Sequence, residues 1–231
     1  GPWPAMIAMT TVVAIQALVF QDGGLVVLGA NILNMGILGV LEANAVYRLS
    51  QKRVGGKPWG MYVSGFLAAW VSIMAAALAV ALQLAFSGRS PANIAIPTMA
   101  GVHALIGLGE ALITVGALAF IRATRPDLLQ AGSLPSRQSN LVWILGLLLA
   151  VVLAVASPLA SANPDGLEWA AEKLGFMENA QGAGYEIIPD YVLPGINNEA
   201  VATILAGILG VLIVFGVALG VAYMRRRRSA S

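Results

Sequence analysis

Long apolar runs alternate with short polar segments along this chain. About six stretches hold 18 or more mostly apolar residues, and a helix of that length crosses the roughly 30 Å hydrocarbon core of a bilayer. Because backbone groups in lipid must be hydrogen-bonded within their own segment, we expect helices. The runs are 3–20, 25–49, 61–86, 93–121, 141–160 and 200–224. The pattern predicts an all-α fold, a polytopic membrane helix bundle of about six transmembrane helices.

The composition narrows the class of protein and the kinds of site. The chain is 58% hydrophobic and 10% charged, whereas a soluble domain carries about 25% charged residues. Its net charge of +2 is small and its basic residues lie beside the apolar runs, so we expect no nucleic-acid partner. With no cysteine and one histidine, this chain alone cannot form a disulfide, a thiolate metal site or a site of several imidazoles.

The basic residues predict how the bundle is oriented. Ten of the 13 Lys and Arg residues lie in the loops after the second and fourth runs and in the carboxyl-terminal tail. If every run spans once, these segments share one side, and the positive-inside rule makes that side the cytoplasm. Segment 161–198, just before the last run, is acidic, with Lys173 as its one basic residue. We expect a multi-pass protein of the cell membrane with a cytoplasmic carboxyl terminus and an extracytoplasmic 161–198 segment.

The acidic segment contains its own helix signal. Asp165 can cap a helix, Glu168 stands where a capping box needs an acid, and Gly175 is a suitable end. The short helix is equally consistent with a solvated surface element and with an element that docks on the outer face of the bundle.

A few polar residues fall inside the apolar runs. His103 and Glu110 are seven apart in the fourth run, so two helical turns place them on one face. Asn31 and Asn34 are three apart in the second run, and Gln16 lies near the outer end of the first. At similar depth, His103, Asn31, Asn34 and Gln16 could form one polar pocket in the outer half of the bundle, suited to a divalent ion directly or through supporting hydrogen bonds.

The same residues have a structural interpretation. A membrane histidine or asparagine often only hydrogen-bonds to a neighbouring helix. Glu42 is expected to reach the inner interface and pair with Arg48, whereas Glu110 is deeper and favours a polar network.

Several catalytic motifs are missing from the sequence. It contains no GxxxxGK[ST], HExxH or GxSxG pattern. An intramembrane enzyme using Glu110 and His103 as acid and base is disfavoured because no nucleophile accompanies them. We therefore expect no enzymatic activity and no ATP hydrolysis through a P-loop.

Several motifs occur in the order typical of one family. Residues 28–35 read Leu-Gly-Ala-Asn-Ile-Leu-Asn-Met, residues 101–110 contain His103 and Glu110, and residues 125–129 read Arg-Pro-Asp-Leu-Leu. With the opening through Asp22-Gly23-Gly24, these motifs resemble the CbiM/NikM family of substrate-specific membrane subunits of energy-coupling-factor cobalt and nickel transporters. Residues 164–168, Pro-Asp-Gly-Leu-Glu, and the last run resemble the PDGLE domain. The resemblance implies a CbiM/NikM-like domain over 1–140 and a PDGLE-like module over 141–231.

The resemblance implies a substrate-binding component of an importer. Its substrate would be Co²⁺ or Ni²⁺, for cobalamin biosynthesis or nickel enzymes, and no cofactor is expected. Its partners would be a transmembrane coupling subunit and cytoplasmic ATPase subunits. The alternative is a membrane assembly or scaffold protein without transport activity of its own, in which the polar residues only hold helices together.

The main metal ligands of the family do not match residues of this sequence. In the family they come mainly from an amino terminus that begins Met-His-Ile-Pro-Asp-Gly and from a further histidine, both expected before Gly1. The residues that carry over, as pocket-lining or supporting groups, are His103, Glu110, Asn31, Asn34 and Gln16. We therefore expect weak metal binding by these 231 residues, and the choice between cobalt and nickel stays open.

Overall fold

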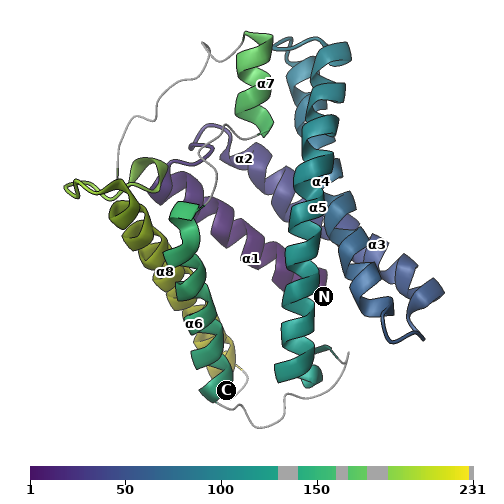
Figure 1. Ribbon diagram of the computed structural model, residues 1–231, viewed down its shortest axis with the longest axis vertical. Helices are drawn as coiled ribbons and strands as arrows, with labels where there is room; N and C mark the ends of the chain where they lie inside the picture. Colours follow the sequence, from purple (N-terminus) through teal and green to yellow (C-terminus); the bar gives the residue numbers. More distant parts are fainter. Residues whose placement is uncertain (130–139, 160–165, 176–186, 229–231) are drawn as a thin grey trace. The chain divides into compact units, whose positions relative to one another are not determined.

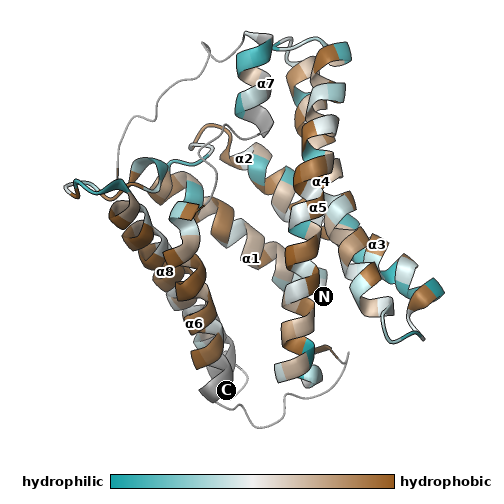
Figure 2. Cartoon of the chain, in the orientation of Figure 1, coloured by the Kyte–Doolittle hydropathy of each residue, from teal (hydrophilic) through white to brown (hydrophobic). Residues whose placement is uncertain are grey.

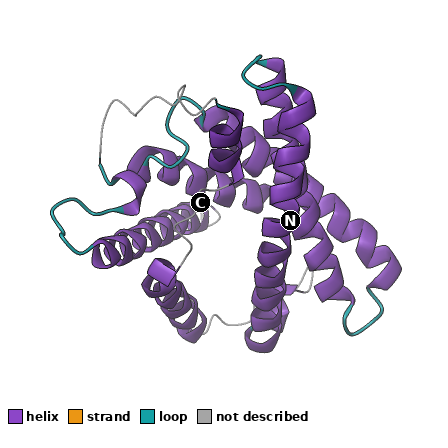
Figure 3. Cartoon of the chain, turned by 45° about the horizontal axis from the view of Figure 1, so that its top comes forward, coloured by secondary structure: helices purple, strands orange, loops and turns teal. Residues whose placement is uncertain are grey.

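A computed structural model describes residues 1–129, 140–159, 166–175 and 187–228, and this part of the chain is helical without any β-strand (Figures 1 and 3). The predicted all-α fold is confirmed. In chain order the elements are α1 (Pro2–Ile15), η1 (Gln16–Phe20), α2 (Leu28–Asn31), η2 (Ile32–Leu38), α3 (Gly39–Val54), α4 (Gly60–Phe86), α5 (Ala92–Thr124), η3 (Pro126–Leu129), α6 (Asn140–Ala156), η4 (Ser157–Leu159), α7 (Gly166–Leu174), η6 (Pro189–Tyr191) and α8 (Glu199–Arg228). The elements η1 and η2 are π-helical turns, and the other η elements are 3₁₀ turns.

Within the described residues, four helices are long and apolar enough to cross a membrane: Pro2–Phe20, Gly60–Phe86, Ala92–Thr124 and Glu199–Gly220. A shorter apolar helix covers Ile144–Leu159. The second predicted run forms α2, η2 and α3 in succession, and polar residues lower its hydropathy toward the end of α3 (Figure 2). The membrane bundle is thus confirmed, and the number of six spans stays a prediction.

The chain divides into two compact units, each considered by itself. The first contains α3, α4, α5 and α7, with the first residues of α1 and most of η2. The second contains the rest of α1, η1, α2, α6, η4, η6 and α8.

Small side chains hold the first unit together. Ala77 and Ala81 of α4 form a buried cluster with Ala95 and Met99 of α5. Small residues let two helices approach closely, and packing drives helix association in lipid because the tails are as apolar as the side chains. Polar contacts follow the same interface, where the Trp70 indole N–H donates to the Ala104 carbonyl at 3.1 Å.

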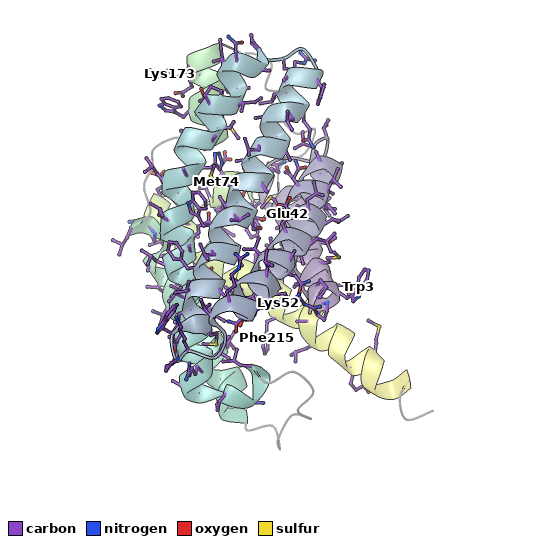
Figure 4. All side chains as sticks on the ribbon, turned by 90° about the vertical axis from the view of Figure 1, so that its right-hand side faces the viewer. Trp3, Glu42, Lys52, Met74, Lys173 and Phe215 are labelled. Carbon is purple, nitrogen blue, oxygen red and sulfur yellow. The ribbon has the colours of Figure 1, made fainter. Side chains whose placement is uncertain are left out.

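The two ends of the first unit differ in the residues and elements that lie there. At one end, the Arg122 guanidinium donates to the Pro58 carbonyl at 3.1 Å and lies 5.7 Å from the Tyr62 ring centre. At the other end, α7 lies beside the beginning of α5 (Figure 1). Figure 4 labels one residue near each end, Lys52 on α3 and Lys173 on α7.

The predicted short helix is confirmed as α7, which ends before Gly175, a residue with φ of +71°. Glycine adopts this left-handed conformation without a Cβ penalty. Glu168 lies in the first turn of α7, whereas the expected cap Asp165 lies outside the described residues.

Close packing also organises the second unit. A Cβ added to Gly207 of α8 would lie 3.3 Å from the Cβ of Ala154 in α6. Ala202 and Ala206 of α8 are fully buried. Helix α6 is apolar along its length, and α8 is apolar over Glu199–Gly220, before the arginines at its end (Figure 2).

Two glycines of α5 allow a test of the α4–α5 interface. A Cβ at Gly107 would lie 3.0 Å from Trp70 Cδ1, whereas a Cβ at Gly109 would have no neighbour within 4 Å. Gly107→Leu should therefore destabilise the protein by about 1–3 kcal/mol through overpacking, and the matched variant Gly109→Leu should not. The check is the unfolding temperature of both variants in detergent, and equal temperatures would refute this packing.

Candidate functional site

A polar cluster lies at the end of the first helix, in the second unit. We call residues 16–24 the corner: here the chain leaves η1 and turns through Gln21, Gly23 and Gly24, all with positive φ. The Gln16 side-chain NH₂ group donates to Asp22 Oδ2 at 3.3 Å and to the Tyr191 hydroxyl at 3.2 Å. The Tyr191 hydroxyl in turn donates to Asp22 Oδ2 at 2.7 Å. These three side chains form a closed hydrogen-bond triangle.

An apolar layer supports the triangle. The Tyr191 ring stacks on Phe20, with ring centres 4.6 Å apart and planes 18° apart. Phe20, Ile188 and Ala206 form a buried cluster, and Gly210 leaves room for the Phe20 ring, which a Cβ there would approach to 3.1 Å. The layer holds the Tyr191 ring in place, so its hydroxyl is kept beside Gln16 and Asp22.

The electrostatics of the triangle favour a neutral phenol. Burial, followed by the hydrogen bond to Asp22, raises the pKa of Tyr191 well above its ordinary value of 10.0. Tyr191 therefore keeps its proton at physiological pH and remains a donor to the Asp22 carboxylate.

Asn31 lies over the same corner. A Cβ at Gly23 would lie 2.6 Å from Asn31 Nδ2, so the amide packs directly on the backbone of this glycine. Gln16 and Asn31, both predicted to line a pocket, thus contact the same turn, although no hydrogen bond joins them within the described residues.

Asn34 contacts a different partner, in the first unit. Its side chain is buried, and it exchanges two hydrogen bonds with Gln83 of α4, at 3.0 and 2.9 Å. Asn34 lies within η2, and a π-type turn holds about one residue more than an α-turn. The spacing of three residues from Asn31 therefore does not predict a shared face here.

His103 is oriented by its own helix. Its Nδ1 lies 2.9 Å from the Met99 carbonyl oxygen. A carbonyl only accepts, so in the neutral ring Nδ1 carries the proton and Nε2 keeps its lone pair. A backbone carbonyl holds many metal-binding histidines in this way, with the second nitrogen available as a ligand.

Glu110 lies two turns further along α5, on the same side of the helix as His103. Its side chain is exposed. No hydrogen bond within the described part of the first unit joins Asn34, His103 and Glu110 to one another. The single pocket inferred from the sequence stays a prediction.

The expected ion pair between Glu42 and Arg48 is not formed. Glu42 Oε2 is buried without a hydrogen-bond partner among the described residues, and Arg48 is exposed (Glu42 is labelled in Figure 4). The reason is helical geometry, because residues three or four apart face each other and residues six apart do not.

The described residues contain no group of three or more His, Asp or Glu side chains that could hold a metal ion. What they offer instead are separate groups that could each contribute one contact to an ion: the Nε2 of His103 and the amides of Gln16 and Asn31. Sequence reasoning missed Asp22 and Tyr191 as members of a site. Two sequence signals pointed to Asp22: it is an acid directly after an apolar run, in the turn Gln21-Asp22-Gly23-Gly24, and this turn belongs to the opening motif of the family resemblance.

Two protein families match successive parts of this chain. The family described as "Cobalt uptake substrate-specific transmembrane region" (CbiM) matches residues 1–128, and the PDGLE domain matches residues 140–227. We call these the CbiM region and the PDGLE region. No solved structure matches the chain significantly.

Several curated proteins are similar to both regions or to the first. A protein of Archaeoglobus fulgidus, provisionally named a fused nickel transport protein NikMN, is 35% identical over 100% of this chain and 75% of its own length. The fused nickel transport protein NikMN of Rhodobacter capsulatus is 31% identical over 95% of this chain and 74% of its own length. The cobalt transport protein CbiM of Sorangium cellulosum is 38% identical over 56% of this chain and 58% of its own length. The chain therefore belongs to the CbiM family of cobalt-uptake transmembrane proteins, and a PDGLE domain follows its CbiM region.

Proposed function

We propose that this chain is the substrate-binding membrane component of an energy-coupling-factor importer for Co²⁺ or Ni²⁺. The observation that carries the proposal is the similarity of the entire chain to relatives named as fused nickel transport proteins. The cobalt-uptake family match over residues 1–128 supports cobalt as the other candidate substrate. The imported ion would serve cobalamin biosynthesis or nickel enzymes.

In this proposal the energy for transport comes from partners. The sequence contains no P-loop pattern, so ATP would be hydrolysed by separate cytoplasmic ATPase subunits and its energy passed on through a transmembrane coupling subunit. The chain itself would catalyse no covalent reaction. Its tasks would be to accept the ion on the outer side and to change orientation or shape for release.

The arrangement of each unit supports an orientation with the basic loops inside. In the first unit, Arg122 lies in the last turn of α5, at the end away from α7, and contacts Pro58, the neighbour of Lys57 (Figure 1). Lys52 of α3 also lies away from Lys173 of α7 (Figure 4). In the second unit, α8 begins beside η6 and ends at Arg228. Basic residues at one end of each unit and the acidic segment at the other are the pattern expected for a cytoplasmic and an external face.

His103 is the residue we propose to face the metal or a ligand of the metal. Its Nδ1 is committed to the Met99 carbonyl, which leaves Nε2 for an ion, a water molecule or a partner side chain. Gln16, Asn31 and Asn34 would line or support the same pathway, and Glu110 would add negative charge near it. An unpaired carboxylate within an apolar helix is costly, which favours a functional role for Glu110.

The first test is metal uptake by cells that express the natural gene with its coupling and ATPase subunits. His103→Ala should lower cobalt or nickel uptake at least tenfold, the lower bound for loss of a supporting group at a metal site. Asn93→Ala changes an exposed polar residue of the same helix and should leave uptake unchanged.

Equal uptake by His103→Ala and the wild type, at equal protein levels, would remove His103 from the site. If the wild type imports neither ion although all subunits are present, the chain is better described as a membrane assembly protein.

The second test concerns how tightly these 231 residues bind metal ions. One imidazole and no thiolate provide few of the nitrogen and sulfur ligands that Co²⁺ and Ni²⁺ prefer. Calorimetry of the purified chain with either ion should therefore show millimolar or weaker binding. Micromolar or tighter binding would contradict this expectation, and its loss in His103→Ala would then identify the ligand.

The third test concerns orientation. The chain has no cysteine, so a single introduced cysteine can be labelled without background. In intact cells a membrane-impermeant maleimide should label Arg89→Cys and Glu168→Cys. Lys52→Cys should be labelled only after the membrane is opened, and its labelling in intact cells would reverse the proposed topology.

A further inference from the structure

We propose that Tyr191 is a positioning residue that fastens the PDGLE region to the corner of the CbiM region and fixes the Gln16 amide for metal uptake. This inference rests on the proposed function. It concerns the side chains of Gln16, Asp22 and Tyr191. Tyr191 is 175 residues away from Gln16 in the sequence but is hydrogen-bonded to it.

The first argument is the direction of the hydrogen bonds. A carboxylate only accepts, so the group of Gln16 that faces Asp22 Oδ2 is the NH₂ and not the oxygen. The same NH₂ donates to the Tyr191 hydroxyl, whose own proton goes to Asp22 Oδ2. The two acceptors lie close together and hold the NH₂ end of the Gln16 amide between them. Oε1, at the other end of the amide, is the acceptor left to meet a cation or another donor.

The second argument is that Tyr191 completes this arrangement in two ways. Its ring stacks on Phe20, and its hydroxyl closes the triangle. The backbone adds a further tie between the regions, since the Ile188 N–H donates to the Val19 carbonyl at 3.1 Å. Without the hydroxyl, the Gln16 NH₂ would lose an acceptor and the amide could rotate, so Oε1 would no longer have a fixed direction.

The third argument is the backbone of η6. Asp190 and Tyr191 have φ of 52° and 59°, a left-handed conformation that costs energy for residues with a Cβ. Such residues persist where surrounding contacts hold them. Here the contacts of Ile188 and Tyr191 with the corner supply that restraint. The segment is therefore held in its shape by the CbiM region, and it should relax when the contact is weakened.

The closing experiment uses the full chain and two readouts. Tyr191→Phe keeps the stacking ring and removes only the hydroxyl. In purified protein it should speed amide hydrogen exchange of the peptide containing Ile188 by roughly fivefold, the effect of losing one ordinary hydrogen bond. In cells with all subunits, it should lower cobalt or nickel uptake severalfold at unchanged protein level.

Matched variants sharpen the test. Asp22→Ala removes the acceptor and should act like Tyr191→Phe in both readouts. The double variant should lose less than the sum of the two single variants, because both single variants remove the hydrogen bond between Tyr191 and Asp22. Asp22→Asn keeps an oxygen acceptor and should lie in between. Tyr62→Phe is the control in the first unit and should change neither readout.

Two results would overturn the proposal: unchanged exchange in Tyr191→Phe, or faster exchange with full uptake. Failure of the proposed function is separate from both. If the wild type imports neither ion, that function fails, and the exchange rates alone decide whether Tyr191 fastens the two regions.

Discussion

The constraint on which this structure depends is that polar groups inside a membrane bundle must find partners within the protein. Hydrocarbon offers no hydrogen bonds, and an unpaired polar group there costs several kcal/mol. Glu42 Oε2 and Ser64 Oγ are buried without a hydrogen-bond partner among the described residues. Other polar groups of the described helices meet this constraint in two ways. The Trp70 indole and the Ser72 hydroxyl donate to the backbone carbonyls of Ala104 and Gly39. Asn34 and Gln83 instead satisfy each other through a reciprocal pair of amide bonds.

Polar groups that are fully satisfied hold helices together, and the functional candidates are those with bonding capacity left over. Asn34 and Gln83 illustrate the first kind. His103 and Gln16 illustrate the second, because each commits one end of its side chain and leaves the other end, Nε2 or Oε1, available. This distinction explains how the same residue types can be fully used in packing at one place and keep a free bonding position at another. It also explains why a list of buried polar residues does not by itself define a site.

Local features could be predicted from the sequence, and distant contacts could not. Apolar length predicts the membrane helices, and the capping signals predict α7 and its end at Gly175. The π-helical turns at Gln16–Phe20 and Ile32–Leu38 add a residue per turn without a sequence signal, so helical spacing fails between Asn31 and Asn34. Tyr191 reaches Asp22 across 169 residues, in an acidic segment whose sequence is equally consistent with a solvated surface element and with a docking element.

Fusion of the two regions in one chain accounts for the small size of their contact at the corner. One aromatic stack, one backbone hydrogen bond and two side-chain hydrogen bonds would be a weak interface between separate proteins, which usually need about 1,200 Å² or more of buried surface. When both regions belong to one chain, each meets the other at an effective concentration in the millimolar range, so a small contact can be occupied. A contact of this size can hold the corner firmly enough to orient Gln16 and still open at modest cost.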